Sequence, residues 1–260
     1  MKLDGGNLKI EYFGLTDVGR KREKNEDSLF VDGELGLFMV ADGMGGHLGG
    51  EFASRIAVKT VSETIQQILK DPEATLSLNL GFDRSDYGEM LKYAIRVASH
   101  RIFEEASKNP NLRGMGTTSV AVLIQNGKGY IAHVGDSRAY LVREKSIQQL
   151  THDHSLVAEQ LRAGFITEDE VKNHKFRNII TRSVGFQSDV EVDLLVRDID
   201  AGDHFVLCSD GLTNMVENED ICELTYKQDP KNTCQQLIEL ANKNGGDDNI
   251  SVVVVKISEN

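Results

Sequence analysis

The chain has 260 residues, and its 29 Lys and Arg against 41 Asp and Glu give a formal net charge of −12. This acidity argues against nucleic acid or an anionic membrane as a partner, because both are polyanions that would repel the chain. Hydrophobic residues make up 40% and charged residues 27%, which is typical of a globular protein. No apolar run reaches the ~18 residues of a membrane span. Residues 1–11 lack the apolar core of a signal peptide, so we expect a cytoplasmic protein.

The cysteines exclude two further classes of protein. Cys208, Cys222 and Cys234 form no CxxC pair, which argues against a zinc knuckle or a thioredoxin-like motif. An odd number of widely spaced cysteines also argues against a disulfide framework. Only three prolines are present, and no proline-rich linker divides the chain. We therefore expect residues 1–260 to form a single domain.

The first half of the chain combines strand patterns with two long helices. Strands are expected over 8–15, 28–31 and 35–41. Apolar residues at helical spacing predict helices over 51–70 and 87–108. A glycine-rich segment, 43–50, precedes the first helix, and a loop is expected over 71–85.

The second half is rich in strands, with hairpin turns between several of them. These strands are expected over 118–125, 129–134, 138–143, 146–150, 190–196, 204–208 and 250–257. Two helices, near 218–226 and 232–242, separate the last two strands. The polar segment 153–182 interrupts the strand series and is expected to form a helical flap. Together the patterns predict an α+β domain in which helices cover antiparallel sheets.

Carboxylates stand at the ends of several predicted strands. Asp42, Asp136 and Asp210 each follow an apolar strand, and Asp248 precedes the last one. Each of these residues alone is explained by turn chemistry, since Asp and Gly are ordinary turn residues. If the strand ends meet, however, the carboxylates would repel one another unless a cation bound them. Oxygen ligands alone favour Mg²⁺ or Mn²⁺ over zinc.

The chain resembles the metal-dependent Ser/Thr protein phosphatases of the PPM (PP2C) type, particularly the compact bacterial members. The resemblance rests on eight blocks that occur in order over about nine-tenths of the chain. The blocks are residues 17–28, 40–47, 114–118, 134–141, 150–155, 177–182, 208–212 and 247–251. A single Asp-Gly pair would be weak evidence, whereas eight ordered blocks are specific.

The resemblance implies a four-layer α-β-β-α sandwich, in which two central antiparallel sheets are flanked by helices. It also implies that Asp42 bridges two metal ions and that the Gly43 carbonyl binds the second ion. Asp210 and Asp248 would hold the first ion. The flap at 153–182 matches a segment that varies within the family and is linked to substrate choice.

Further roles are implied for charged residues outside this core. Glu26, with or without Asp27, would act at the second ion, directly or through water. Asp136 would hold a third, weaker ion together with Asp210. Arg22 matches the arginine that binds the substrate phosphate. Arg20 is its local competitor, and the spacing to Glu26 within the family favours Arg22.

The family chemistry explains why these residue types are needed. Two Mn²⁺ or Mg²⁺ ions about 3.5–4 Å apart activate a bridging hydroxide, which attacks the phosphorus of phosphoserine or phosphothreonine. Some members carry a histidine after the Asp-Gly pair as general acid, but this chain has Met44. The proton donor therefore stays open, and a water on the third ion is preferred. Thr117 and Thr118 are expected to serve strand packing only.

The leading hypothesis is thus a protein Ser/Thr phosphatase, with Arg22 and Asp42 as its catalytic residues. A catalytically silent signalling or binding module with this fold is the alternative from another class. A phosphatase that acts on a sigma-factor antagonist shares the chemistry and differs in substrate. Phosphorylated proteins are the expected partners, with a Ser/Thr kinase and its substrates as candidates, and we expect a monomer.

Overall fold

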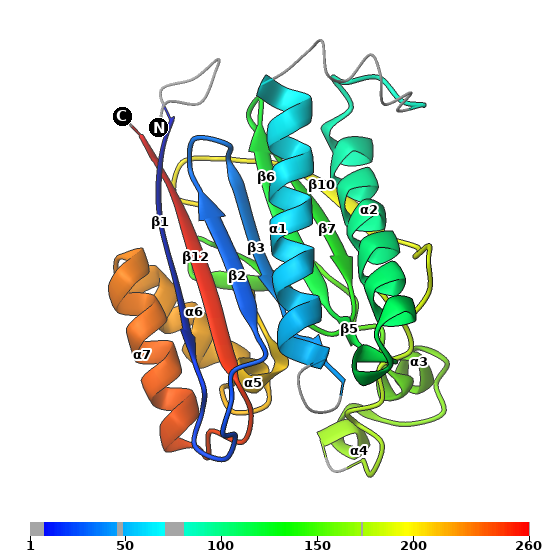
Figure 1. Ribbon diagram of the computed structural model, residues 1–260. Coiled ribbons are helices and arrows are strands. Elements are labelled where there is room, and N and C mark those ends of the chain that lie inside the picture. The colour runs from blue at the N-terminus through cyan, green and yellow to red at the C-terminus, as the bar shows by residue number, and fades with distance from the viewer. Residues whose placement is uncertain (1–7, 46–48, 71–80, 173, 260) are drawn as a thin grey trace.

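The computed structural model describes residues 8–45, 49–70, 81–172 and 174–259, and its centre is a pair of five-stranded antiparallel sheets (Figure 1). The first sheet has the order β1 (Leu8–Asp17), β12 (Ile250–Glu259), β11 (His204–Cys208), β8 (Arg138–Arg143), β9 (Ser146–Gln149). The second has the order β10 (Asp193–Asp198), β7 (Lys128–Val134), β6 (Ser119–Gln125), β3 (Leu37–Ala41), β2 (Ser28–Asp32). A short ladder also pairs β4 (Gly43–Met44) with β5 (Gly116–Thr117).

Helices cover the outer face of each sheet. The second sheet is covered by α1 (Gly49–Lys70) and α2 (Tyr87–Lys108). The first is covered by α5 (Asp210–Thr213), α6 (Asn218–Lys227) and α7 (Pro230–Lys243). At one end lie the flap helices α3 (Leu156–Arg162) and α4 (Glu168–Lys172), and a 3-10 turn, η2 (Pro110–Leu112), follows α2. This is the expected four-layer α-β-β-α sandwich. No helix within the described ranges combines the length and apolarity needed to cross a bilayer.

The side-chain alternation of the central strands builds the layers. On β3, Leu37 and Met39 pack against α1 and α2, whereas Phe38 and Val40 enter the interface between the sheets. On β12, Val253 and its i+2 neighbours face the same interface, while the alternate residues face α7. Both faces of these strands are therefore buried, which explains why their sequences read as continuous apolar runs rather than as an apolar–polar alternation.

The structure differs from the sequence expectations at several boundaries. Helix α1 begins at Gly49, two residues earlier than predicted, within the glycine cluster. A Cβ on Gly50 would lie 2.8 Å from the carbonyl carbon and oxygen of Gly43, so the close approach of the two backbones requires glycine here. The predicted strand 190–196 is displaced to β10, and the short helix α5 was not predicted. Residues 46–48 and 71–80, within the predicted glycine-rich segment and loop, lie outside the described residues.

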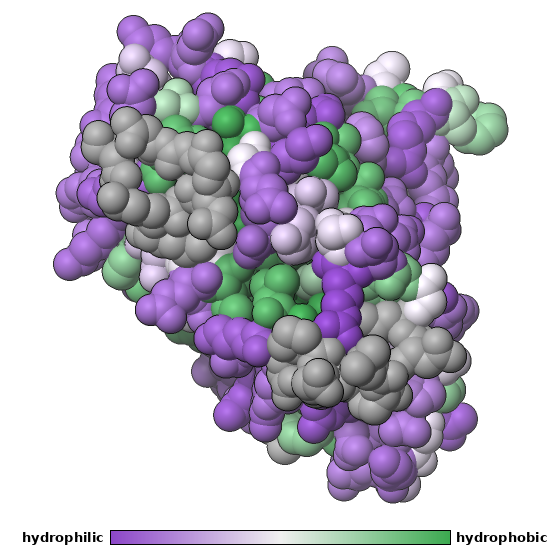
Figure 2. Space-filling model, turned by 90° about the horizontal axis from the view of Figure 1, so that it is seen from above, coloured by the Kyte–Doolittle hydropathy of each residue, from purple (hydrophilic) through white to green (hydrophobic). Residues whose placement is uncertain are grey.

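The two ends of the sandwich differ in character. The end that carries α3, α4 and α5 is where β3 terminates (Figure 1), and β11 leads directly into α5. The opposite end, seen from above in Figure 2, is largely hydrophilic, with apolar side chains gathered in its central part. The strand-end aspartates singled out in the sequence therefore lie at the flap end.

Candidate metal centre

Carboxylates from both sheets meet at the flap end of the sandwich. Asp42 follows β3, and Asp136 follows β7, in the second sheet. Asp210 follows β11, and Asp248 precedes β12, in the first sheet. The negative charges of Asp136, Asp210 and Asp248 all act on Asp42, because the stacking of the sheets brings these strand ends together. The strand adjacency that the sequence could only assume is present in the structure.

The negative charges of the carboxylates in this cluster repel one another, so each group disfavours the ionisation of its neighbours. Burial, followed by the charges of its neighbours, raises the pKa of Asp42 well above its ordinary value. Burial and the nearby Asp248 raise the pKa of Asp210. The same causes, led by burial, raise the pKa of Asp27 to about 7 and that of Asp136 to about 8. Ionising all of these groups together requires a compensating positive charge.

The donor set fits a hard divalent cation. The Asp27 Oδ1 and Asp136 Oδ1 atoms are buried and have no hydrogen-bond partner. Buried carboxylate oxygens of this kind are costly unless an ion or water binds them. The gathered ligands are oxygens only, which suits Mn²⁺ and Mg²⁺. The unpartnered oxygens and the raised pKa values are therefore both features that a bound divalent cation would satisfy.

Glu26 and Gly43 lie at the margin of the cluster, where the start of α1 meets β4. Burial is the largest cause of a raised pKa at Glu26, and the nearby Arg22 opposes it. A Cβ on Gly43 would lie 2.1 Å from the Gly50 carbonyl oxygen and 2.5 Å from the Glu26 carbonyl oxygen. Only glycine allows the three backbones to pack this closely.

Arg22 is the arginine that reaches the carboxylates. Its Nη2 atom donates a hydrogen bond to the Asp248 Oδ2 atom at 2.6 Å, and its side chain is 53% exposed. Arg20 instead contributes its backbone N–H, which donates to the Gly246 carbonyl at 2.7 Å. A guanidinium that is held beside the cluster and open to solvent is suited to bind a phosphoryl group. The geometry therefore favours Arg22 over Arg20.

Two threonines do more than pack. The Asp42 N–H donates to the Thr118 Oγ1 atom at 2.9 Å, and the Thr118 N–H donates to the Asp42 carbonyl at 2.8 Å. The Thr117 hydroxyl donates to the same carbonyl at 2.8 Å. The expectation that these threonines serve packing only was thus incomplete, because they also hold the backbone of Asp42. A double threonine at the start of a strand carries no local signal of this role.

Asn249 is a positioning residue that the sequence reasoning did not single out. Its Oδ1 atom accepts from the Glu26 N–H at 2.7 Å. Its Nδ2 atom donates to the carbonyls of Val18 and Lys24 at 3.0 and 2.9 Å. One side chain at the start of β12 therefore fixes the loop that carries Arg22 and Glu26. The only hint in the sequence was its place directly after Asp248.

A second group of metal-binding residue types lies beside the cluster. His133, His154 and Asp193 place one ligand atom each within 4.8 Å of one another. The two imidazole rings are stacked, with centroids 4.7 Å apart and planes 17° apart. Nearly parallel rings direct their in-plane lone pairs side by side rather than at one ion. The Asp193 carboxylate also accepts a hydrogen bond from Arg182 at 2.6 Å. The group is thus organised as a hydrogen-bonded network.

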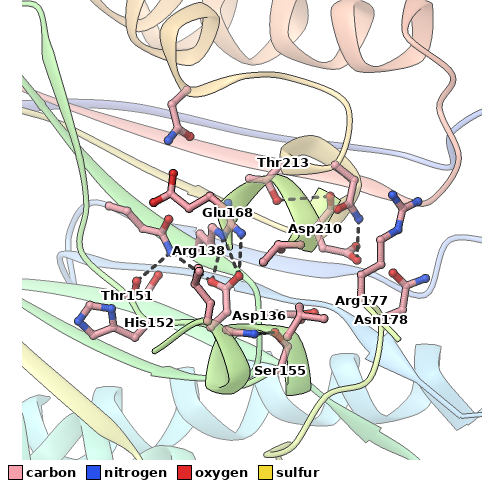
Figure 3. A pocket seen from close by; sticks show the side chains of 18 of the residues that line it. Asp136, Arg138, Thr151, His152, Ser155, Glu168, Arg177, Asn178, Asp210 and Thr213 are labelled. Carbon is pink, nitrogen blue, oxygen red and sulfur yellow. Dashed lines mark hydrogen bonds and ion pairs between the residues drawn. The ribbon is translucent and has the colours of Figure 1, made fainter. Parts of the chain in front are cut away.

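A cavity of about 590 Å³ adjoins the cluster and runs beneath the flap (Figure 3). Asp136 and Asp210 line it together with Arg177 and Asn178 of the flap. Arg138 lies within the cavity wall and pairs with Asp153 at 2.7 Å. The cavity therefore connects the carboxylate cluster with the segment 153–182.

Comparisons of the sequence and of the structure with known proteins agree on one family. The family model of Protein phosphatase 2C matches residues 19–251. The serine/threonine phosphatase stp of Listeria welshimeri is 40% identical over 247 residues, which cover 93% of each chain. The crystal structure of the Mycobacterium tuberculosis serine/threonine phosphatase PstP/Ppp superposes with a TM-score of 0.85 at 33% identity, covering 96% of this chain and 99% of that one. The PstP catalytic domain in complex with two manganese ions has a TM-score of 0.83 at 33% identity and covers 97% and 100%. With its carboxylate cluster at the junction of two stacked sheets, the chain belongs to the protein phosphatase 2C family.

Proposed function

We propose that this protein is a metal-dependent serine/threonine phosphatase that hydrolyses phosphoserine and phosphothreonine in proteins. The observation that carries the proposal is the convergence of Asp42, Asp136, Asp210 and Asp248 beside Arg22. A centre of this kind suits phosphate monoesters, whose uncatalysed hydrolysis is extremely slow. The serine/threonine phosphatases among its relatives support the same assignment.

Asp42, Asp210 and Asp248 would hold the core ions, with the carbonyl of Gly43 and the carboxylate of Glu26 at the second. Asp27 would support this site from its buried position beside Ser209, whose hydroxyl donates to the Asp27 Oδ2 atom at 2.8 Å. Asp136 would hold a third, weaker ion together with Asp210. When bound, Mn²⁺ or Mg²⁺ supplies Lewis-acid polarisation and a more acidic water.

The chain's own side chains contribute binding and orientation. Arg22 would turn from Asp248 toward the phosphoryl oxygens, which match its planar fork of donors. Met44, which follows the Asp42-Gly43 pair, is a thioether without a proton to donate. The leaving serine or threonine oxygen would therefore take its proton from water.

The substrate is proposed to be a phosphorylated protein segment that enters along the cavity beneath the flap. Asp136, Asp210 and residues of the flap line the same cavity, so a phosphorylated residue bound beside the two aspartates would place its neighbours against the flap. A Ser/Thr kinase and its substrates are the candidate partners. The flap is the segment through which such a partner would be selected.

We further propose that residues 1–260 act as one catalytic domain and as a monomer in the cytoplasm. The three cysteines are all free and buried, as expected for a protein in a reducing compartment. Size-exclusion chromatography with light scattering tests the monomer, and cell fractionation tests the location. A stable dimer, or recovery in the membrane fraction, would contradict these points.

The test is phosphate release from phosphopeptides, a phosphorylated kinase domain and a phosphorylated sigma-factor antagonist, with Mn²⁺ or with EDTA. The proposal expects release from phosphothreonine substrates with Mn²⁺ and its loss in EDTA. Equal rates in both conditions would overturn metal dependence. Absence of release together with absence of Mn²⁺ binding in calorimetry would instead support a silent binding module. Release from the antagonist alone would narrow the substrate class.

A further inference from the structure

A row of hydroxyl side chains ends the interface between the two sheets on the side of the carboxylate cluster. Thr16 on β1, Ser251 on β12 and Ser209 directly after β11 lie next to one another on three neighbouring strands of the first sheet. Ser251 and Ser209 each stand two positions from an apolar residue of the interface, namely Val253 and Leu207, and therefore share its face. Both serines are fully buried, and a buried hydroxyl is costly unless it is hydrogen-bonded. We call Thr16, Ser251 and Ser209 the hydroxyl row.

The side chain of Ser209 is directed to Asp27 rather than to the helix that follows it. Ser209 stands directly before α5, where a serine ordinarily caps a helix by accepting from a backbone N–H of the first turn, but its side chain makes no such bond. Its Oγ atom instead accepts from the Ser251 N–H at 2.9 Å and donates to the Asp27 Oδ2 atom at 2.8 Å. The other acceptor within reach of its proton, the Asn249 carbonyl oxygen, is 3.4 Å away. The closest partner of this hydroxyl proton is therefore a carboxylate of the cluster.

The two carboxylate oxygens of Asp27 have different surroundings. The Oδ2 atom accepts from Ser209, whereas the Oδ1 atom is buried and has no hydrogen-bond partner among the described residues. Burial is the largest cause of the raised pKa of Asp42, and the charge of Asp27 is the next, so Asp27 lies beside the candidate metal ligands. A donor on one oxygen hinders rotation of the carboxylate and leaves the other oxygen available to a cation or to its water ligands.

The outer end of the hydroxyl row is tied to the backbone of Asp27. The Thr16 Oγ1 and Ser251 Oγ atoms are hydrogen-bonded at 2.7 Å, and the Thr16 Oγ1 atom also accepts from the Asn25 Nδ2 atom at 2.8 Å. The Asn25 Oδ1 atom accepts from the Asp27 N–H at 3.0 Å. These bonds form a closed ring that begins at the Asp27 backbone and returns to its carboxylate. Because Asp27 directly precedes β2, the ring joins the two sheets.

We propose that the hydroxyl row positions the Asp27 carboxylate, with Ser209 holding one oxygen so that the other stays available at the cation site. The inference rests on the proposed function in that Asp27 supports the second ion. Thr16, Ser251 and Ser209 are positioning residues, since they act through Asp27 and need not touch an ion or the substrate. A carboxylate that is held in place before an ion arrives loses less conformational entropy on binding, which increases the affinity for the ion.

Substitutions that remove single hydroxyls change the shape of the row very little. Ser209→Ala removes the donor to Asp27, and Thr16→Val removes the hydroxyl at the outer end. Thr16→Ser keeps that hydroxyl and is the conservative counterpart. Ser119→Ala is the matched control, because Ser119 at the start of β6 is also buried but its hydroxyl has no hydrogen-bond partner in the described part of the chain.

The affinity for Mn²⁺, measured by calorimetry, is the first readout. We expect Ser209→Ala to weaken Mn²⁺ binding about tenfold, because residues that orient metal ligands typically contribute at least this much. We expect Thr16→Val to weaken it about threefold, since its hydrogen bonds lie further from the carboxylate. Thr16→Ser and Ser119→Ala should bind Mn²⁺ as the wild type does. Wild-type affinity in both Ser209→Ala and Thr16→Val would overturn the proposal.

The same measurement in an Asp27→Ala background separates positioning from general damage. Without a carboxylate to position, Ser209→Ala should have no further effect on the affinity for Mn²⁺. Equal weakening in both backgrounds would mark a general structural effect and contradict the role of the row. If Ser209→Ala does not fold, Thr16→Val completes the same cycle from an exposed position, with the same two outcomes.

Phosphate release from a phosphothreonine peptide is the second readout. At limiting Mn²⁺, Ser209→Ala should have a lower kcat, which should recover as Mn²⁺ is raised, while the KM for the peptide stays unchanged because Arg22 keeps its place. A higher KM at saturating Mn²⁺ would place the row at the substrate and contradict the proposal. Wild-type protein that binds Mn²⁺ but releases no phosphate would refute the proposed function, and the binding cycle would still decide the role of the row.

Discussion

At the scale of single residues, two aspartates at strand ends show how the same residue type serves different purposes. Asp32 ends β2, and its Oδ1 atom accepts hydrogen bonds from the N–H groups of Glu34 and Leu35. These two hydrogen bonds within the turn are an ordinary role for an aspartate at a strand end. Asp42 follows β3 at the opposite end of the same hairpin, and its neighbours are other carboxylates. Turn chemistry therefore explains Asp32 but leaves the surroundings of Asp42 unexplained.

Asp42→Asn should lower the rate of phosphate release by about three orders of magnitude, because a neutral amide would hold divalent cations far more weakly than the carboxylate does. The same change should raise the thermal stability of the metal-free protein, since it removes one repelling charge, and Mn²⁺ should no longer raise the melting temperature. Enzyme kinetics measures the rate, and differential scanning calorimetry measures the melting temperature with and without Mn²⁺. Asp198→Asn is the control, because the Asp198 side chain at the end of β10 is 86% exposed. An Asp42→Asn protein with the wild-type rate would remove the proposed role.

At the scale of elements, the centre depends on contacts between segments that are distant in sequence. Asp248 and Asn249 directly precede strand β12, and the Asn249 amide fixes the loop between β1 and β2. Thr118, which contacts Asp42, directly precedes strand β6. In each case the residues just before a strand hold a loop or the end of a neighbouring strand, so the strand ends support one another.

Asn249→Ala should release the loop that carries Arg22 and Glu26. Loss of three partly buried hydrogen bonds is expected to cost about 2–4 kcal/mol in the free energy of unfolding. The KM for a phosphopeptide should rise more than kcat falls, because Arg22 loses its fixed position. Asn249→Asp keeps the acceptor for the Glu26 N–H and should therefore lose less of the free energy of unfolding than Asn249→Ala. Equal stability and equal KM in all three proteins would contradict this role.

At the scale of the whole molecule, part of the net charge of −12 is concentrated in one site. Six acidic residues gather there, namely Glu26, Asp27, Asp42, Asp136, Asp210 and Asp248. Two divalent ions would bring the formal charge to −8, since −12 + 4 = −8. The acidity that excludes nucleic acid is therefore in part a binding site for cations, and a filled site would attract phosphate.

The metal-free protein should lose stability as the pH rises from 7 to 8. The folded-state pKa values of Asp27 and Asp136 are raised to about 7 and 8, so the folded protein holds protons that the unfolded chain has released. Their stabilisation is fully present below about pH 4, the pKa of an aspartate in the unfolded chain, and is lost progressively up to about pH 8, by up to about 1 kcal/mol per pH unit for each group. His133 and His154 have lowered pKa values and act in the opposite direction, but only below about pH 6.5.

Chemical denaturation in EDTA at pH 6.5, 7, 7.5 and 8 measures this loss. With Mn²⁺ present, the trend should reverse, because the cation binds the deprotonated carboxylates and its stabilising effect grows with pH. Asp136→Asn in EDTA should flatten the dependence, since it removes one titrating group. Stability that rises from pH 7 to 8 in EDTA would show that these carboxylates are already ionised in the folded protein.

The sequence by itself determined the elements and the candidate residues. Apolar spacing was sufficient for α2 at 87–108 and β11 at 204–208, because local structure follows local periodicity. Asp42, Asp136 and Asp210 stood out because each follows an apolar strand. The family resemblance then implied roles for them, and the four-layer arrangement that it implied is present.

Only the tertiary structure decided which of these residues meet and what holds them. Asp42 and Asp248 are about 200 positions apart, and their proximity follows from the stacking of two sheets, which no local spacing encodes. The same holds for the hydrogen bonds of Thr118, Asn249 and Ser209, since a side chain's partner across a fold depends on packing rather than on its neighbours in sequence. Short-range periodicity thus specifies strands and helices, whereas long-range packing assembles the site.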